Sequence, residues 1–333
     1  EEKRLALVIG NSNYDSIAKL SNPVNDAKLI AKTLESLNFD VILATNLDED
    51  SFMQKIMEFD DIRDNYDVGF VYYAGHGIQI DGNNYLIPTN QNFDVEWKVK
   101  KYAIDVNDIM EFLTGSSDEV NILILDACRN NPWEGSFRSI GSSNNGGLAK
   151  ITVPGGSLIA FSTEPGSVAD DGEGLNSVYC TSLVENMKLT NTTLDQVFRN
   201  VRADVREASG GRQRPLEESQ LTGQAFYLNP TDIAPLYEIV KTWDPDVNYN
   251  DLLINIEKIL IISPNNYSAR LIKARLLYFL ENNEKSLNEF NDIESYFLND
   301  ILYYKYRASL YSVGLNDNEK ALLDYNKLIE LEP

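Results

Sequence analysis

The sequence predicts an α/β domain, built on a doubly wound, mostly parallel sheet flanked by helices, followed by an all-α helical-repeat domain. Two observations predict this arrangement. Short β-rich apolar runs alternate with amphipathic helical segments from residue 4 to about residue 227, the pattern of parallel strands joined by helical crossovers. After Pro230 no strand pattern is evident, and helical segments follow one another. At this length we expect two domains, residues 1–230 and residues 231–333.

Strands and helices are predicted in alternation along the first domain. The apolar runs are continuous rather than alternating, which predicts central strands covered on both faces. They lie at residues 4–10, 41–44, 68–74, 121–125 and 157–161. Helices are predicted from Pro23, where apolar residues recur at helical spacing, and near residues 50–64, 105–113, 176–187 and 193–207. Residues 129–154 are rich in Gly, Ser and Asn, which predicts a flexible loop.

Composition excludes two function classes. The chain has 29 basic and 51 acidic residues, so nothing would neutralise the phosphates of a nucleic acid. No apolar run approaches the roughly 18 residues that span a bilayer, so a membrane protein is not expected. Residues 1–230 carry 19 basic and 34 acidic residues, net −15. That acidity favours basic substrates, although solubility explains most of these charges equally well.

The chain has two cysteines, Cys128 and Cys180. Two are too few for a disulfide framework, so a reducing compartment and a cytoplasmic location are the simpler expectation. The sequence begins at Glu1 without a methionine. A removed signal peptide would look the same, which leaves the location open.

The second domain shows a faint internal period. The spacing from Ala274 to Ala308 equals the spacing from Leu287 to Ala321. This period fits tetratricopeptide repeats, whose units are helix pairs of about 34 residues. The expected helix pairs are residues 271–280 with 285–296 and residues 301–313 with 319–331, after half a unit at residues 252–262. A plain helical bundle is the alternative. Repeats of this kind bind protein partners, so we expect a docking or regulatory module.

Two reactive side chains follow neighbouring predicted strands. His76, the single histidine, stands between Gly75 and Gly77 directly after one strand, where glycines would let the backbone turn sharply. Cys128 follows another strand, flanked by an acid, an arginine and a polar loop, whereas Cys180 lies in a helical stretch and fits a buried structural cysteine. Ligands bind at the carboxyl ends of strands in such sheets, so His76 and Cys128 are expected to meet there.

Several motifs resemble caspase-fold cysteine peptidases of the caspase and metacaspase type, including bacterial homologues. In matching order these are the run at residues 5–10, Asn-Asp-Ala at residues 25–27, Tyr-Ala-Gly-His-Gly at residues 73–77, Asp-Ala-Cys-Arg at residues 126–129 and Phe-Ser-Thr-Glu-Pro-Gly at residues 161–166. The resemblance covers roughly residues 3–228. It implies an endopeptidase that acts on proteins or peptides and requires no cofactor.

The resemblance also implies residue roles. Cys128 would attack the scissile carbonyl, His76 would shuttle protons, and the backbone N–H groups of Gly77 and Cys128 would form the oxyanion hole. A bystander histidine and a buried thiol are the alternatives for the two side chains. A catalytically inactive scaffold that binds partners through its repeats is the alternative for the whole chain. No motif of an esterase or a nucleotide-binding enzyme is present.

Specificity departs from that of animal caspases, which prefer aspartate and carry glutamine two residues before the nucleophile. Here that position is Asp126. In metacaspases and paracaspases an acid at this position lines the primary pocket, and metacaspases add the aspartate that matches Asp26. Two carboxylates in one pocket would bind a guanidinium or ammonium, which implies cleavage after Arg or Lys. Ser162 belongs to the groove-lining motif, and Asp170 and Asp171 would reinforce a basic preference. A helix-start acid and a surface turn acid are the alternatives for Asp26 and Asp126.

Two further expectations concern processing and calcium. The loop of residues 129–154 lies where caspases are cut into subunits, and it contains Arg138 and Lys150, so an enzyme of this specificity could process itself there. An uncut chain is equally credible. Some metacaspases need calcium, and Asp105 and Asp108 lie in a comparable stretch, although acids this sparse do not make a calcium site by themselves.

Overall fold

The structure is a computed structural model. It describes residues 2–93, 95–114, 120–128, 151–164, 174–222, 226–230, 244, 246–262 and 266–331. The chain forms two compact units, one of Glu1–Leu189 with Thr193–Asn229 and one of Thr190–Thr192 with Pro230–Pro333. Among the described residues no helix has the length and apolarity to cross a bilayer.

The first unit is organised around a sheet of eight strands in the order β2-β1-β3-β6-β7-β8. Its strands are β1 (Arg4–Gly10), β2 (Phe39–Thr45), β3 (Val68–Ile80), β4 (Asn83–Leu86), β5 (Ile104–Asp105), β6 (Val120–Cys128), β7 (Ser157–Phe161) and β8 (Leu216–Ser219). The first five members of that order pair in parallel, β8 pairs antiparallel with β7, and β4 pairs with β3 and β5. The predicted doubly wound, mostly parallel sheet is therefore confirmed.

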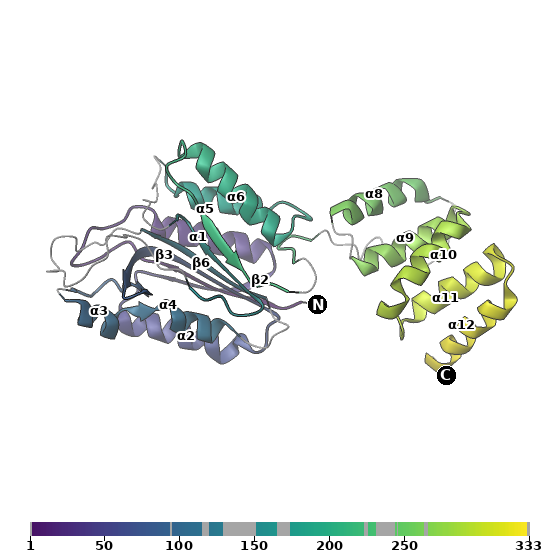
Figure 1. The fold of residues 1–333 in the computed structure, drawn as a ribbon, viewed down its shortest axis with the longest axis horizontal. Helices are drawn as coiled ribbons and strands as arrows, with labels where there is room; N and C mark the ends of the chain where they lie inside the picture. Colours follow the sequence, from purple (N-terminus) through teal and green to yellow (C-terminus); the bar gives the residue numbers. More distant parts are fainter. Residues whose placement is uncertain are drawn as a thin grey trace. The chain divides into compact units, whose positions relative to one another are not determined.

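Helices cover both faces of this sheet (Figure 1). They are α1 (Pro23–Ser36), α2 (Glu49–Arg63), α3 (Glu96–Tyr102), α4 (Val106–Leu113), α5 (Val178–Met187) and α6 (Leu194–Ala208). One apolar core joins α1, α5 and α6 to one face of the sheet, and a second joins α2 and α4 to the other. Burial of central strands on both faces is the physical reason for their continuous apolar runs.

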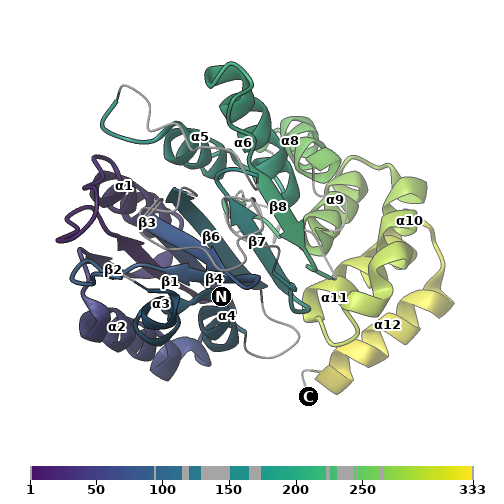
Figure 2. The ribbon, with the colours of Figure 1, turned by 60° about the vertical axis from the view of Figure 1, so that its left-hand side comes forward.

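Three local predictions were wrong. The strand predicted at residues 41–44 is not central, because β2 is an edge of the sheet, opposite β8 (Figure 2). His76 does not follow its strand, because β3 continues to Ile80 and folds back as a hairpin with β4. Nor does the backbone turn sharply at Gly75 and Gly77, since both lie within β3. The turn comes at Asp81 and Gly82, whose φ angles of 52° and 85° are typical of a two-residue hairpin.

The second unit consists of helices among its described residues. They are α8 (Tyr249–Ile262), α9 (Tyr267–Phe279), α10 (Asn283–Ile293), α11 (Ile301–Ser309) and α12 (Asn318–Leu331), with a 3-10 turn η1 (Glu294–Tyr296) and a π turn η2 (Leu310–Gly314). Two apolar clusters hold them together, one centred on α8 and α9 and one that joins α9 to α12. The helical C-terminal region is thus confirmed.

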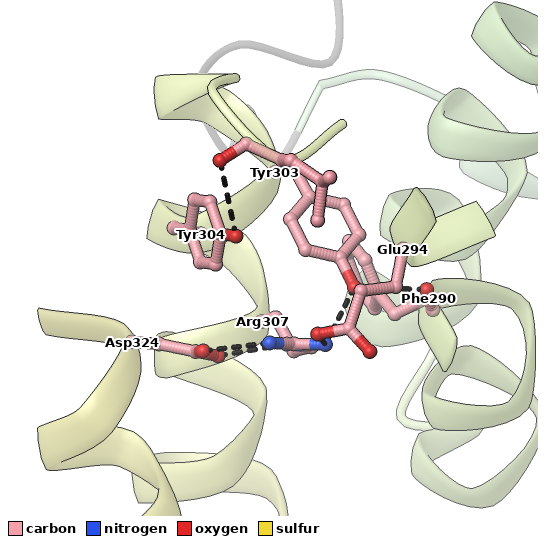
Figure 3. A network of polar contacts seen from close by, with 7 residues as sticks. Phe290, Glu294, Tyr303, Tyr304, Arg307 and Asp324 are labelled. Carbon is pink, nitrogen blue, oxygen red and sulfur yellow. Dashed lines mark hydrogen bonds and ion pairs between the residues drawn. The ribbon is translucent and has the colours of Figure 1, made fainter. Parts of the chain in front are cut away.

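A buried arginine ties the last three helices together (Figure 3). Arg307 of α11 makes a two-pronged ion pair with Asp324 of α12, with both N–O distances 2.8 Å. Its third nitrogen donates to Glu294 at 2.9 Å and to the hydroxyl of Tyr303, which in turn donates to Phe290 O at 3.0 Å. Arg307 is 7% exposed and Asp324 is 4% exposed, so the loss of either partner would leave the other as a buried, unpaired charge.

Candidate active site

The two residues predicted to react lie side by side in the backbone of the sheet. In the parallel register of β3 and β6, Ala74 pairs with Asp126 and His76 with Cys128. Neighbouring strands run about 4.8 Å apart. Cys128 is the last residue of β6, and its side chain lies outside the described part of the structure. Both positions stand at the carboxyl-end edge of the parallel sheet, where ligands bind in this class of fold.

The His76 ring is held by the loop that follows β1. Its Nε2 lies 2.8 Å from the carbonyl oxygen of Ala18, and the Tyr14 ring lies against it at 4.6 Å between centroids. A carbonyl oxygen only accepts a hydrogen bond, so this contact assigns the hydrogen to Nε2. Nδ1 is then the nitrogen that carries the lone pair when the ring is neutral. His76 is 6% exposed.

Two tyrosine hydroxyls hold the peptide groups of His76. Its N–H donates to the Tyr14 hydroxyl at 2.8 Å, and the Tyr73 hydroxyl donates to its carbonyl oxygen at 2.8 Å. A Cβ at Gly75 would lie 2.5 Å from one hydroxyl and 2.6 Å from the other, closer than real atoms approach. The glycine before His76 is therefore explained by the space these hydroxyls fill and not by a turn.

Gly77 lies opposite Leu86 in the β3–β4 hairpin. The adjacent N–H of Ile87 donates to His76 O at 3.1 Å, so the backbone polar groups of residue 76 are on the side of β3 that faces β4. Hydrogen-bonded and open pairs alternate along an antiparallel ladder. The N–H of Gly77 consequently faces away from β4.

The two acids predicted for one pocket are close together. Asp26 of α1 and Asp126 of β6 are both buried, with 2% and 8% of their surfaces exposed. Ser177 bridges them, since its N–H donates to Asp26 Oδ1 at 3.0 Å and its hydroxyl donates to Asp126 Oδ2 at 3.0 Å. Asn176 adds a bond to Asp26 at 2.8 Å, and the Tyr72 hydroxyl adds one to Asp126 at 3.1 Å.

These surroundings make the pair hard to ionise. Burial, and then the charge of Asp26, raise the pKa of Asp126 to about 7, against the opposing effect of nearby hydroxyls. Burial also raises the pKa of Asp26, although its hydrogen bonds oppose the change. Among the described residues no Lys or Arg forms an ion pair with either acid. Two buried carboxylates that no described basic side chain neutralises define a place where a basic group would be stabilised.

Sequence reasoning missed the residues that link the acids. Ser177 is the N-cap of α5, where its hydroxyl accepts from Cys180 N–H at 3.0 Å. A serine before a helix is a recognisable capping signal. Its contacts with Asp26 and Asp126 depend on tertiary packing, and so does the contact of Tyr72. No sequence pattern predicts the contacts of either residue.

Cys180 and Ser162 are both buried near the acid pair. The Cys180 thiol is fully buried in α5, and burial, then Asp26 and Asp126, raise its pKa, so it is a poor nucleophile. Ser162 directly follows β7, and its N–H donates a hydrogen bond to Leu125 O at 3.1 Å. Its hydroxyl has no hydrogen-bond partner at normal distance among the described residues, but it lies near enough to Asp126 to oppose the rise of that pKa.

Other predicted site residues are placed elsewhere or not described. Asp170, Asp171, Arg138 and Lys150 lie outside the described residues. Asp105 caps α4, because its carboxylate accepts from the N–H of Asn107 at 2.8 Å. Within the described ranges no group of three or more His, Cys, Asp or Glu side chains is arranged to hold a metal ion.

The fold and this site define an α/β domain with a histidine and a cysteine side by side on adjacent strands. The sequence model of the family described as "Caspase domain" matches residues 3–226, which is most of the chain. The chain therefore belongs to the caspase domain family of cysteine peptidases.

Individual relatives are matched in part. The chain is 29% identical over 126 residues to the human "Mucosa-associated lymphoid tissue lymphoma translocation protein 1", over 38% of this chain and 15% of that protein. It is 31% identical over 139 residues to "Paracaspase" of Dictyostelium discoideum, over 38% and 31%. It is 24% identical over 259 residues to "Caspase-1" of Sus scrofa, over 68% and 59%. The matches thus span less than two thirds of each relative's length.

Proposed function

We propose that this protein is a cysteine endopeptidase that cleaves proteins after Arg or Lys, with Cys128 as the nucleophile and His76 as the general base. The observation that carries the proposal is the placement of a buried acid pair beside the His76–Cys128 register pair. Asp126 precedes Cys128 by two residues on β6, and Ser177 connects it to Asp26. A thiol residue, an imidazole and two buried acids near one edge of the sheet support this assignment.

The reaction follows from these positions. The Cys128 thiol gives its proton to His76 Nδ1, and the sulfur attacks the scissile carbonyl carbon. Collapse of the tetrahedral intermediate breaks the C–N bond, and the His76 proton passes to the leaving amine. His76 then takes a proton from water, whose oxygen attacks the thioester, and returns it to the sulfur as the peptide acid leaves.

The negative oxygen of each tetrahedral intermediate needs hydrogen-bond donors. The Gly77 N–H is a candidate because it faces away from the β3–β4 ladder, and the Cys128 N–H is the second donor in this proposal. One such donor typically contributes a factor of about 10² to 10³ in kcat.

Asp26 and Asp126 bind the basic side chain of the substrate. Burial, and then the charge of Asp26, raise the pKa of Asp126. A guanidinium or ammonium between the two acids would relieve their repulsion. An acidic side chain would add a third negative charge and be rejected. Binding of a basic side chain should therefore weaken as the pH falls below about 7, where Asp126 becomes protonated.

Fluorogenic peptides that end in Arg, Lys or Asp test this function. We expect turnover of the Arg and Lys peptides only, no turnover by Cys128→Ala, and a loss of at least a hundredfold in kcat/KM for Asp126→Asn, as for a broken buried ion pair. Asp61→Asn, which changes an exposed acid of α2, is the matched control. Turnover of the Asp peptide would refute the pocket assignment, and activity in Cys128→Ala would refute the mechanism.

The same assay addresses the cofactor. We expect equal rates with added calcium and with a chelator, because no metal ion takes part in the proposed steps. A rate that requires calcium would point to a metal site that involves acids such as Asp108. Cleavage of the chain at Arg138 or Lys150, read by mass spectrometry, would establish self-processing.

We assign the second unit to partner binding through tetratricopeptide-like repeats. Equivalent contacts recur in its two helix pairs: Lys273 of α9 pairs with Glu289 of α10 at 2.8 Å, and Arg307, one sequence period later, pairs with Asp324. The second helix pair, α11 with α12, is slightly longer than the first, α9 with α10. The distance along the sequence between the two helix starts is one residue greater in the second pair. The π turn at Leu310–Gly314 accommodates one extra residue.

A pull-down with the full chain tests this assignment. We expect a protein partner that the chain retains when Cys128 is changed to Ala, because binding and catalysis would use different units. A partner lost with that substitution would place its binding in the catalytic unit instead.

A further inference from the structure

The peptide groups on both sides of the His76 Cα are held by side chains from two different elements. Tyr14 comes from the loop after β1, and Tyr73 comes from β3 itself. The His76 N–H donates to Tyr14 Oη, and Tyr73 Oη donates to His76 O, both at 2.8 Å. The two hydroxyl oxygens are 3.3 Å apart.

These contacts have a definite direction. A tyrosine hydroxyl has one hydrogen to donate. If Tyr73 gives its hydrogen to His76 O, then Tyr14 is the donor in the contact between the two hydroxyls. The Tyr14 hydrogen is not used toward His76, because the Tyr14 oxygen accepts from the His76 N–H. The four groups then form a closed cycle that starts and ends on the backbone of His76. A further acceptor near Tyr73 Oη is Ile87 O, at the longer distance of 3.4 Å.

We propose that Tyr14 and Tyr73 are positioning residues that fix the backbone of His76, and with it the direction of its imidazole, through this cycle of hydrogen bonds. The proposal rests on the proposed function for its catalytic consequence. The same loop that supplies Tyr14 also supplies Ala18 O to the ring Nε2 at 2.8 Å. The loop thus holds His76 at its main chain and at its ring, and these two contacts together fix the direction of Nδ1.

The space around the cycle supports this role. Both hydroxyls occupy the volume in which a Cβ at residue 75 would stand, so a larger residue there would displace them. The rings themselves are packed independently of the hydroxyls. Tyr73 stacks on Phe52 at 5.9 Å, and Tyr14 contacts the His76 ring at 4.6 Å. Phenylalanine at either position keeps these contacts and removes only the hydrogen bonds.

The single histidine allows a direct test that needs no enzymatic activity. Histidine-selective 15N labelling of the full chain gives one backbone amide signal, that of His76. We expect hydrogen exchange of this amide to be about tenfold faster in Tyr14→Phe than in wild type, as for the loss of one buried hydrogen bond. Tyr66→Phe is the matched control, because it removes one hydroxyl bond, to Asp40, elsewhere in the unit.

Kinetics with an Arg peptide complete the test. We expect kcat to fall about tenfold in Tyr14→Phe and in Tyr73→Phe, with KM changed less than twofold, and no change in Tyr66→Phe. Unchanged amide exchange in Tyr14→Phe would disprove the cycle, and faster exchange with an unchanged kcat would disprove its role in catalysis. Inactive wild-type protein would instead refute the peptidase proposal, while the exchange rates would still decide whether Tyr14 holds His76.

Discussion

Asp126→Asn tests the energetic cost of the acid pocket. Burial and the neighbouring Asp26 raise the pKa of Asp126 from 3.8 to about 7, so the folded protein binds this proton more tightly than the unfolded chain does. A pKa unit corresponds to about 1.4 kcal/mol, which puts the cost of ionising the folded pocket on the order of 4 kcal/mol. Asparagine keeps an oxygen that can accept from Tyr72 and Ser177 without the charge.

The sign of the pH dependence of stability follows from the direction of the Asp126 pKa shift. Because the folded-state pKa lies above the unfolded value, the contribution of Asp126 to stability is largest below about pH 4. It is lost as the pH rises and is fully lost above about pH 7. Asp126→Asn has no such loss. We expect the variant to be more stable than wild type at pH 8, by up to about 4 kcal/mol, and similar to wild type near pH 4.

Urea unfolding of the full chain measures this difference. Wild type, Asp126→Asn and the exposed control Asp61→Asn would be compared at intervals between about pH 5 and about pH 8, where Asp126 titrates. The reasoning is refuted if the free-energy difference between wild type and Asp126→Asn is independent of pH, or if the variant is the less stable protein at pH 8. Its Arg-peptide activity should be lost at the same time.

Further substitutions test other parts of the account. Gly75→Ala should lower kcat at least tenfold, since its Cβ would displace two hydroxyls, and an active variant would contradict the packing described. Ser177→Ala should shift the acid limb of the kcat/KM profile to higher pH, because the hydroxyl lowers the pKa of Asp126; the control Thr193→Ala, a cap of α6, should not. Arg307→Met should cost about 3 to 5 kcal/mol of unfolding free energy by stranding buried Asp324, and a loss below about 1 kcal/mol in urea unfolding would show the pair to be dispensable.

The layout of the sheet was predictable because its central strands are buried on both faces. The runs at residues 4–10 and 157–161 coincide with β1 and β7. Two of the elements that were missed differ in the strength of their signal. The strand β8 reads Leu-Glu-Glu-Ser at an edge of the sheet, where half-exposed residues need no apolar pattern. The hairpin of β3 and β4 had a signal, Asp81-Gly82, that favours a two-residue turn.

Much of the candidate site could also be predicted, because catalytic chemistry limits the residue types. The expectation that Asp26 and Asp126 lie close together came from motifs, and the structure places them around Ser177. The hydroxyls on His76 could not be predicted. Tyr14 lies far from His76 along the sequence. Tyr73 stands in the apolar run of β3, where an aromatic residue is usually part of a core.

The central claim is that Cys128 is an activated nucleophile beside a pocket for basic side chains. Incubation of the full chain with a peptidyl chloromethyl ketone that ends in Arg, and separately with one that ends in Asp, followed by peptide mass spectrometry, tests it most directly. We predict one adduct, on Cys128, formed rapidly with the Arg reagent and lost in Asp126→Asn. An adduct on Cys180, or equal reaction with the Asp reagent, would contradict the account.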